Sequence, residues 1–523
     1  MSPLELEQYW TNLRSLVSER AKVMQRSAFA AVVREAGDLA YAVFDAEGNM
    51  VAQAETGTPG HVNCLEACGK FLIEKFAGNI AEGDVLITND PWLGAGHYFD
   101  ITILAPVFRN GKIIAYLGST NHHADIGGLG MSSMAIDVHQ EGLSIPPMKL
   151  VEAGEPNAVL YDIIRSNVRV PDVVVGDLAA QISSALSGGV AINEMCDRHG
   201  LDDIEELSSE IIQRSEDAMR AAIRGCPAGT WASRCEFELT ADTSIHLDLR
   251  LTIDNERGEV NLDFTGSSDQ LNIGVNVVEN YARAYATFAV RSCLAAELPN
   301  NTGSLRPIKF SAPAGSIINC TYPAPVASRH VVGMYVPMPI LDALFNAVPD
   351  RVLANGPGCP STAVVSGLDD AGKHYNIFFT VAGGMGARRL KPGMDATNYP
   401  TGVRSTPVEM LEREAPIVFI KKELRRGSGG TGRQHGGDGQ VVEFRVRSDK
   451  EWLLSAQCTA LHNPPNGMDG GDPGELSRFL INGKTAVPQF QQRMSRTDTV
   501  RIETAGGAGF GAVEQQYDVK KQS

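Results

Sequence analysis

Histidines and carboxylates gather in two short stretches within the first quarter of the chain. His97 and Asp100 lie close together, and His122 and His123 follow after an apolar stretch, with Asp125 just beyond them. Imidazole nitrogens and carboxylate oxygens are ligands for Zn²⁺, Mn²⁺ and Fe²⁺, and a site with few protein ligands leaves a position for water or substrate. The residue types therefore predict a metal centre that can activate a water molecule.

The segment between these two stretches is typical of a β-hairpin. Apolar runs at 101–108 and 113–118 flank the dipeptide formed by Asn110 and Gly111, which is a strong signal for a tight hairpin turn. A hairpin places the start of its first strand beside the end of its second, so the two stretches should meet. Because neighbouring residues of a strand point to opposite faces, we expect only one histidine of the adjacent pair to face the site, and the pattern leaves open which one.

Hydrophobic periodicity assigns the elements around this hairpin. It predicts a helix that begins after Ser2, a strand pair over 41–52, a helix over 64–76, helical structure over 176–224 and alternating strands from residue 229 onward. The last third is rich in glycine and its strands suggest a β-sandwich or barrel-like unit. We therefore expect an α+β, multi-domain fold with mixed antiparallel sheets, a central helical segment and a Gly-rich, β-rich C-terminal part.

Changes in periodicity and composition divide the chain into four parts. We expect a metal-binding α+β domain over 1–175, a helical segment over 176–228, a second α+β domain over 229–400 and a β-rich domain over 401–523. This division places all the clustered histidines in the first domain.

Composition excludes several classes of protein. The 523 residues include 43% hydrophobic and 21% charged residues, as in ordinary globular proteins. The formal net charge is -16 and no long basic run occurs, so nucleic acid is not an expected partner. No apolar run approaches the roughly 20 residues of a membrane helix and no secretory signal is visible, so we expect no membrane insertion and a cytoplasmic location. Nine scattered cysteines without a C-x-x-C pair predict reduced thiols.

Several motifs together resemble the hydantoinase B/oxoprolinase family. They follow one another in the order of the family between residues 35 and 511, which is nearly the whole chain. The motifs lie at 90–94, followed by His97 and Asp100, at 122–128, at 263–266, at 383–388 and at 406–409.

This resemblance implies the B-type subunit of an ATP-dependent hydrolase that opens cyclic amides such as hydantoins, 5-oxoproline or lactams. In such enzymes an A-type partner binds ATP and Mg²⁺ and phosphorylates the carbonyl oxygen of the substrate. The B-type subunit holds a divalent transition metal (Mn, Zn or Fe) where the activated species is turned over. The resemblance also implies a hetero-oligomer of the two subunits, such as A2B2.

The resemblance assigns the site residues by their match to the family motifs. His97, Asp100 and one of His122 and His123, with His122 preferred, are expected metal ligands and catalytic residues, and Asp38 is expected to complete the ligand set. Two further residues are expected around them. Asp125 could orient an imidazole as a hydrogen-bond acceptor, and Arg388 could bind an anionic substrate.

Two alternatives to a hydrolase subunit stay open at this point. The first is the alpha subunit of a related ATP-dependent ketone carboxylase, and the chain is short for that class. The second is a non-catalytic scaffold for the A-type subunit whose metal is structural and fully ligated by protein. The glycines at 427–432 lack the Lys-Ser/Thr ending of a phosphate-binding P-loop, and Cys64 and Cys68, spaced one helical turn apart, are expected in the core rather than as ligands.

Overall fold

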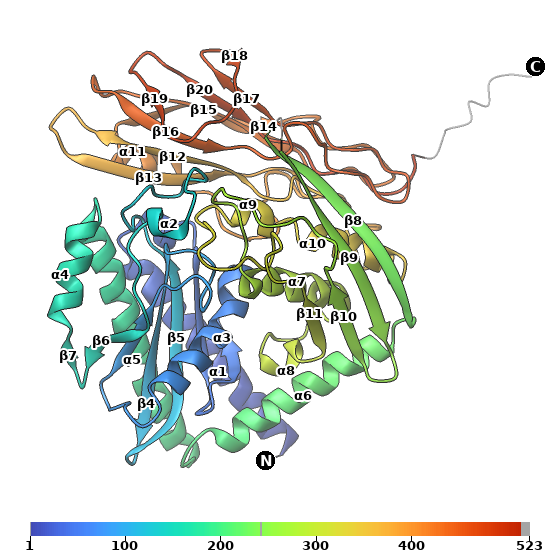
Figure 1. The fold of residues 1–523 in the computed structure, drawn as a ribbon. Helices are drawn as coiled ribbons and strands as arrows, with labels where there is room; N and C mark the ends of the chain where they lie inside the picture. Colours follow the sequence, from blue (N-terminus) through green and yellow to red (C-terminus); the bar gives the residue numbers. More distant parts are fainter. Residues whose placement is uncertain (1, 241–242, 514–523) are drawn as a thin grey trace, which may run out of the picture.

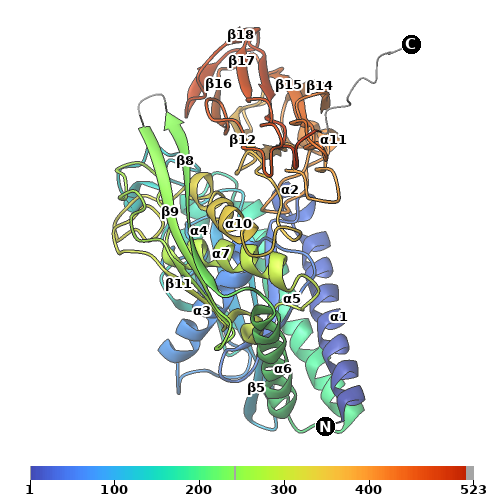
Figure 2. The same cartoon turned by 90° about the vertical axis from the view of Figure 1, so that its right-hand side faces the viewer.

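The computed structural model describes residues 2–240 and 243–513. An N-terminal layer of one large sheet and its helices lies beneath a C-terminal pair of sheets, and a long strand hairpin rises beside both (Figure 1). A view from the side shows the N-terminal helices running along the lower part of the molecule and the C-terminal sheets above them (Figure 2). The candidate residues for chemistry lie where these layers meet.

The N-terminal layer is a seven-stranded sheet with the order β2-β1-β5-β4-β3-β6-β7. The predicted hairpin is confirmed, because Asn110 and Gly111, both with positive φ, join β4 to β5 as a two-residue turn requires. The strands are β1 Leu39–Phe44, β2 Met50–Gln53, β3 Val85–Thr88, β4 Asp100–Arg109, β5 Lys112–His122, β6 Met148–Glu152 and β7 Glu155–Pro156.

Helices cover both faces of this sheet. On one face, α1 (Pro3–Ser27) packs against α5 (Pro171–His199), and on the other lies α3 (Pro59–Lys75). Alternate residues of β1 follow this division, since Tyr41 packs in the α1 and α5 core while Ala42 packs with the α3 residues. The helix α1 begins as predicted, with Ser2 and Glu5 forming a capping box.

The helix α5 is long and apolar enough to cross a membrane by length and composition alone, which the sequence patterns above did not predict. In the structure, however, it contributes to the buried core against α1, β4 and β5. Its buried polar residues bond within the protein: Asp177 accepts from the Phe29 N–H, and Gln181 donates to the Ile101 carbonyl. One face of α5 is therefore packed in the core of the fold, while Leu186 and Val190 on the same helix are exposed.

The helical segment predicted over 176–224 consists of two helices. Gly200 has a left-handed φ of 64° and ends α5, and α6 (Glu205–Arg224) starts after a short connection. The sheet that follows has the order β11-β10-β9-β8 and is antiparallel except for its β10–β11 pair. Its strands are β8 Gly229–Thr240, β9 Thr243–Asp254, β10 Glu259–Asp263 and β11 Ile308–Ser311.

Short and medium helices fill the space between the sheets. Of these, α7 (Glu279–Leu294) packs on α3 and on α10 (Pro337–Phe345), so it links the N-terminal sheet to the β8–β9 hairpin. The remaining helices are the short α2 Ala31–Arg34 and η1 Val138–Gln140, then α4 Ala158–Asn167, α7 Glu279–Leu294, α8 Thr302–Leu305, α9 His330–Gly333, α10 Pro337–Phe345 and α11 Val408–Glu414.

The C-terminal region is a β-sandwich, which is one of the two forms that the sequence suggested, and not a barrel. Its two sheets have the orders β13-β12-β16-β19 and β14-β15-β20-β17-β18, and they share one core that includes Phe379, Phe444 and Trp452. The strands are β12 Ser361–Leu368, β13 His374–Val381, β14 Ile417–Arg425, β15 Gly439–Val446, β16 Trp452–Gln457, β17 Arg478–Ile481, β18 Lys484–Thr485, β19 Gln492–Met494 and β20 Val500–Glu503.

The glycine-rich loops of this region pack backbone against backbone. A Cβ at Gly384 would meet the Gly437 carbonyl, and one at Gly386 would meet the Ala354 carbonyl. These glycines are needed for close packing. The whole arrangement of helices with several antiparallel sheets confirms the α+β fold class.

Candidate active site

The predicted hairpin brings the clustered residues together. Asp100 is the first residue of β4 and lies directly opposite His122, the last residue of β5, in the strand register. His97 comes from the turn that enters β4. One ring nitrogen from each histidine and one carboxylate oxygen all lie within 4.8 Å of one another, and all three residues are buried. The arrangement could hold a metal ion.

Asp100 lies at the centre of this cluster. Its Oδ1 is 2.9 Å from Nε2 of His97 and 3.1 Å from Nδ1 of His122. Its Oδ2 is 2.9 Å from Nε2 of His61 and also forms an ion pair with Arg329. Four nitrogen-bearing side chains thus converge on one buried carboxylate.

The hydrogen bonds of His97 fix its proton on the nitrogen that faces away from Asp100. Its Nδ1 lies 2.9 Å from the carbonyl oxygen of Ala327, which can only accept, and 3.4 Å from Nη1 of Arg329, which can only donate. The shorter contact places the hydrogen on Nδ1. In the neutral ring, Nε2 is then an acceptor, and it faces a carboxylate oxygen, which is also an acceptor. Nε2 has no hydrogen-bond partner among the described residues. Two acceptors in contact need a cation between them, and a metal ion fits that requirement.

A proton on Nε2 of His97 could also join the two acceptors, but this nitrogen is not readily protonated. Burial, followed by the nearby positive charge of Arg329, lowers the pKa of His97 to about 3. Burial by itself would raise the pKa of Asp100, but the surrounding His61, His97 and Arg329 hold it well below the usual range. The pair is therefore a neutral imidazole against an ionised carboxylate, which is the protonation state that a metal ligand set requires.

Arg329 supports the cluster from the segment that leads into α9. Its guanidinium also donates to the carbonyl of Ala95 and lies 4.1 Å above the ring centroid of Tyr281. A buried charge with these fixed partners holds the carboxylate of Asp100 in one orientation. Sequence patterns did not identify Arg329, because nothing in its spacing connects it to residues that lie more than two hundred positions earlier.

His61 is a second residue that sequence patterns did not identify. It lies in the first turn of α3, is buried, and places Nδ1 3.5 Å from Oδ1 of Asp38 while Nε2 faces Asp100. Burial lowers the pKa of His61, but the two carboxylates outweigh burial and raise it. Asp38 thus reaches the cluster through His61. The Asp38 carbonyl also accepts the backbone N–H of His122.

His122 and His123 point to opposite faces of the sheet. His122 faces the cluster and stacks on Phe99, with the ring centroids 5.4 Å apart. His123 faces α5, where its Nε2 lies 3.1 Å from Oε1 of Gln181. Since Gln181 uses its amide hydrogens on the Ile101 carbonyl and a serine, His123 is the donor in this bond.

The two residues expected around the cluster lie elsewhere. Asp125 accepts from the Gly127 N–H and pairs with Arg169 at 2.7 Å, so it holds a loop and contacts no imidazole in the described structure. Arg388 donates to the Pro392 carbonyl in a glycine-rich loop and lines neither of the cavities described next. The acceptor that orients His97 is a backbone carbonyl instead.

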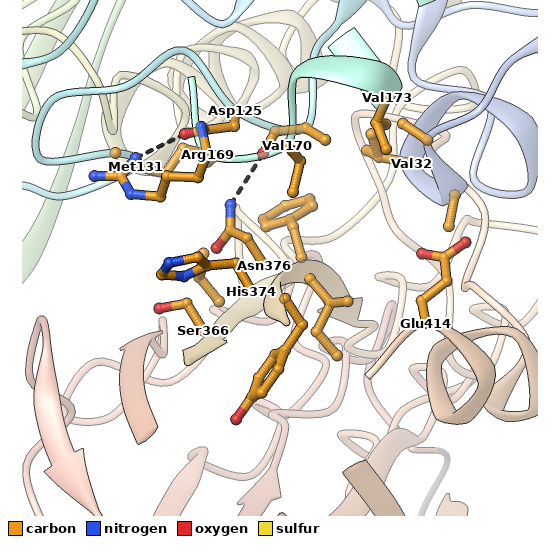
Figure 3. Close-up of a pocket in the computed structure, with 18 of the residues that line it drawn as sticks. Val32, Asp125, Met131, Arg169, Val170, Val173, Ser366, His374, Asn376 and Glu414 are labelled. Atoms are coloured by element: carbon orange, nitrogen blue, oxygen red, sulfur yellow. Dashed lines mark hydrogen bonds and ion pairs between the residues drawn. The ribbon is translucent and has the colours of Figure 1, made fainter. Parts of the chain in front are cut away.

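Two cavities adjoin the cluster. A small inner cavity of about 50 Å³ is lined by Asp38, His61, His97, His122, Arg329 and His330, among others. Neither ring nitrogen of His330 has a hydrogen-bond partner of normal geometry in the described structure. A larger outer pocket of about 390 Å³ lies between the N-terminal sheet and the sandwich, and Figure 3 shows its lining.

The cysteines and the glycine-rich loop over 427–432 have structural roles. Cys64 and Cys68 are buried, and burial raises the pKa of each thiol to about 12, as expected of core residues. All nine cysteines are free, which agrees with reduced thiols. In the loop over 427–432, the amides of Gly427 and Gly429 already bond to the carboxylate of Asp438, so this loop is not an open phosphate cradle.

Comparison with known proteins agrees with this architecture. The sequence pattern of the hydantoinase B/oxoprolinase family matches residues 2–513. An uncharacterised protein of Methanocaldococcus jannaschii is 30% identical, with 98% of this chain and 91% of that protein covered. The B-type subunit of a putative D-/L-hydantoinase from a Pseudomonas species is 27% identical, with 98% and 90% covered.

Two solved structures share the fold. The ATP-dependent caprolactamase of Pseudomonas jessenii superposes with a TM-score of 0.90 at 23% identity, covering 98% of this chain and 91% of that one. A nucleotide-free acetone carboxylase superposes with a TM-score of 0.89 at 18% identity, covering 98% and 76%.

Proposed function

Since the chain belongs to the hydantoinase B/oxoprolinase family, we propose that it is the metal-containing B-type subunit of an ATP-dependent enzyme that opens cyclic amides. The observation that carries this proposal is the contact between Nε2 of His97 and Oδ1 of Asp100, two acceptors 2.9 Å apart in a buried site. A relative described as the B-type component of a hydantoinase and a shared fold with a caprolactamase support the class of substrate and a partner subunit.

His97, Asp100 and His122 would hold a divalent transition metal (Mn, Zn or Fe). Such an ion acts as a Lewis acid, which lowers the pKa of a nearby water molecule towards about 7. The chain's own residues prepare this site. The Ala327 carbonyl keeps the lone pair of His97 directed at the cluster, and Arg329 keeps Asp100 ionised and oriented.

The partner's role follows from the chemistry of amides. An unactivated amide is a poor electrophile, and phosphorylation of its carbonyl oxygen by an A-type subunit with ATP and Mg²⁺ makes the carbon electrophilic. Addition of water to that carbon gives a tetrahedral adduct. The C–N bond then breaks as the ring nitrogen takes up a proton, and a second water cleaves the resulting carboxyl phosphate to carboxylate and inorganic phosphate. We expect the two subunits to form a hetero-oligomer with two copies of each (A2B2).

The inner cavity supplies the groups that these steps need. His61 and His330 line it. Both ring nitrogens of His61 face carboxylates, so His61 can donate a proton but not accept one, whereas the ring nitrogens of His330 have no normal hydrogen bond among the described residues and can exchange a proton near the reacting carbon. Its volume of about 50 Å³ admits a water molecule beside the cluster, since one water takes roughly 30 Å³. A purely structural metal would be closed off by protein ligands, so this open space argues against a scaffold role.

A ketone carboxylase is the second candidate, because an acetone carboxylase shares the fold. Relative chain length favours the hydrolase, since this chain spans 91% of the caprolactamase chain but 76% of the acetone carboxylase chain.

The direct test is to co-express the chain with an A-type subunit and supply ATP, Mg²⁺ and separate cyclic amides. We expect equal amounts of amino acid and inorganic phosphate from at least one lactam or hydantoin. Acetone supplied with bicarbonate is the matched alternative substrate. Carboxylation of acetone without any ring opening would transfer the assignment to the second candidate.

A further inference from the structure

The inner cavity and the outer pocket share a wall. His122, Met131 and Phe378 line both of them. The ring of Phe378 lies 5.8 Å from that of His122, so the wall is made by the cluster itself and by two apolar side chains. A molecule in the outer pocket therefore lies next to the cluster, separated from the inner cavity by these side chains.

The volumes of the two cavities assign them different roles. About 50 Å³ holds one or two water molecules, since each takes roughly 30 Å³, and leaves no room for the body of a ring compound. About 390 Å³ lies within the range of roughly 300–1,000 Å³ that small-molecule sites occupy. A cyclic amide that reacts at the cluster must therefore keep its body in the outer pocket and present only its amide edge to the wall.

The lining of the outer pocket has a polar side and an apolar side. Figure 3 shows Asp125, Arg169, Ser366 and His374 gathered on one side of it. Val32 of α2 and Val173 at the start of α5 lie on the other side, with Val170 between the two sides, and the carboxylate of Glu414 lies below Val32. Such a division suits a compact molecule with hydrocarbon on one side and a polar group on the other.

The charged residues labelled in this pocket are already paired. Arg169 forms an ion pair with Asp125 at 2.7 Å, and Glu414 forms one with Arg34 at 3.0 Å. A paired arginine gains less from a ligand carboxylate than a free one would, because its charge is already balanced. Lys373 and Arg413 also line the pocket, but both are exposed to solvent, where an ion pair with a ligand contributes little.

From this we infer that the outer pocket is the substrate site, and that it selects cyclic amides with an apolar ring or alkyl group over small rings that carry a carboxylate. This inference rests on the proposed function for its reaction, but the pocket itself can be tested by binding alone. Val173 becomes a specificity-determining residue, because it borders the apolar side, and Phe378 and Met131 control how far the amide edge reaches towards His122.

The test uses Val173→Phe, which fills the apolar side, with Val190→Phe as the matched control. Both residues lie on α5, and Val190 is 59% exposed and lines neither cavity. With the complete complex, the kcat/KM for ε-caprolactam should exceed that for 5-oxoproline at least tenfold. Val173→Phe should raise the KM for ε-caprolactam at least tenfold, while Val190→Phe leaves it unchanged. Val173→Leu, a milder change, should raise it about threefold and covers the case in which the larger side chain prevents folding.

A binding experiment separates the two proposals. Saturation-transfer NMR with ε-caprolactam on the purified chain should show binding in the wild type and Val190→Phe, and its loss in Val173→Phe. If this binding pattern is found but no cyclic amide is hydrolysed, the assignment of the pocket is supported and the proposed reaction is contradicted. If hydrolysis occurs with unchanged KM in folded Val173→Phe and Val173→Leu, or if 5-oxoproline is the better substrate, the inference is overturned.

Discussion

The buried histidines on the two faces of the N-terminal sheet differ in their hydrogen bonds. On the face towards α5, His123 donates its Nε2 hydrogen to Gln181, so a donor faces an acceptor and the hydrogen bond needs no bound cation. On the face towards α3, Nε2 of His97 is an acceptor and meets the carboxylate of Asp100, so the contact lacks a cation. Both rings are buried, and only the direction of the hydrogen bond separates them.

This difference distinguishes histidines that stabilise the fold from histidines that take part in the reaction. Burial lowers the pKa of both rings, of His97 to about 3 and of His123 to about 4, so burial alone does not mark a site. The surplus of acceptors on the α3 face does mark one. Substitutions on that face should change the reaction, with or without a loss of stability, whereas substitutions on the α5 face should change stability alone.

The largest effect is expected from His97→Ala. This change removes one of the three proposed ligands, so ring opening by the complete complex should fall at least about 1,000-fold while the complex still assembles. The measurement is the rate of amino acid release with ATP and a lactam, with assembly checked by size-exclusion chromatography. His462→Ala is the matched control, since this ring is exposed and lines neither of the cavities beside the cluster. Equal rates in both variants would contradict the role of His97.

Arg329→Met should destabilise the fold by about 3–5 kcal/mol, because it leaves the Asp100 carboxylate with one fewer cation in a buried site. Urea unfolding of the chain measures this free energy. The control is Arg306→Met, whose ion pair with Glu216 is half-exposed and should contribute about 0–1 kcal/mol. Similar losses in the two variants would mean that Arg329 does not balance a buried charge.

His123→Leu should lower the free energy of unfolding by about 1–3 kcal/mol, since Gln181 Oε1 loses its donor. The kcat of the complex should stay within about threefold of the wild type, because the ring faces away from the cluster. A loss of kcat as large as that of His97→Ala, at unchanged stability, would remove the distinction between the two faces.

The smallest effect concerns the pH dependence of stability on the α5 face. Burial raises the pKa of Asp177 to about 6, against an ordinary value near 3.8. The protonated form therefore stabilises the folded state below the ordinary pKa, and this contribution is lost as pH rises through about 6. Asp177→Asn keeps an acceptor for the Phe29 N–H without this titration. Its stability relative to wild type should rise between pH 4 and 7, measured by urea unfolding, and a constant difference would contradict the assignment.

The sequence predicted those parts of the site that depend on local pattern. Asn110 and Gly111 specify the turn, the turn fixes the register, and the register places Asp100 opposite His122. Strand alternation likewise predicted that the adjacent histidines would separate, and the preference for His122 as the one facing the cluster came from the family motif. The alternating strands of the last third predicted a β-rich unit, but they left open whether it is a sandwich or a barrel.

The rest of the site depends on packing between distant segments. His61 meets Asp100 because α3 packs on the sheet, and Arg329 meets it because a loop more than two hundred residues later crosses the same face. No spacing in the chain encodes these contacts. The helical structure predicted over 176–224 included most of α5 but not its end at Gly200, and the bonds of Asp177 and Gln181 that pack α5 on the core join it to distant segments.

Elemental analysis of the purified chain tests the proposed metal centre most directly. Wild type, His97→Ala and His123→Leu are compared after dialysis against a weak chelator, with protein folding confirmed in each. We expect about one Mn, Zn or Fe ion per chain in the wild type and in His123→Leu, and a loss of at least about tenfold in His97→Ala. Equal metal content in wild type and His97→Ala, or loss in His123→Leu alone, would contradict a metal centre at His97, Asp100 and His122.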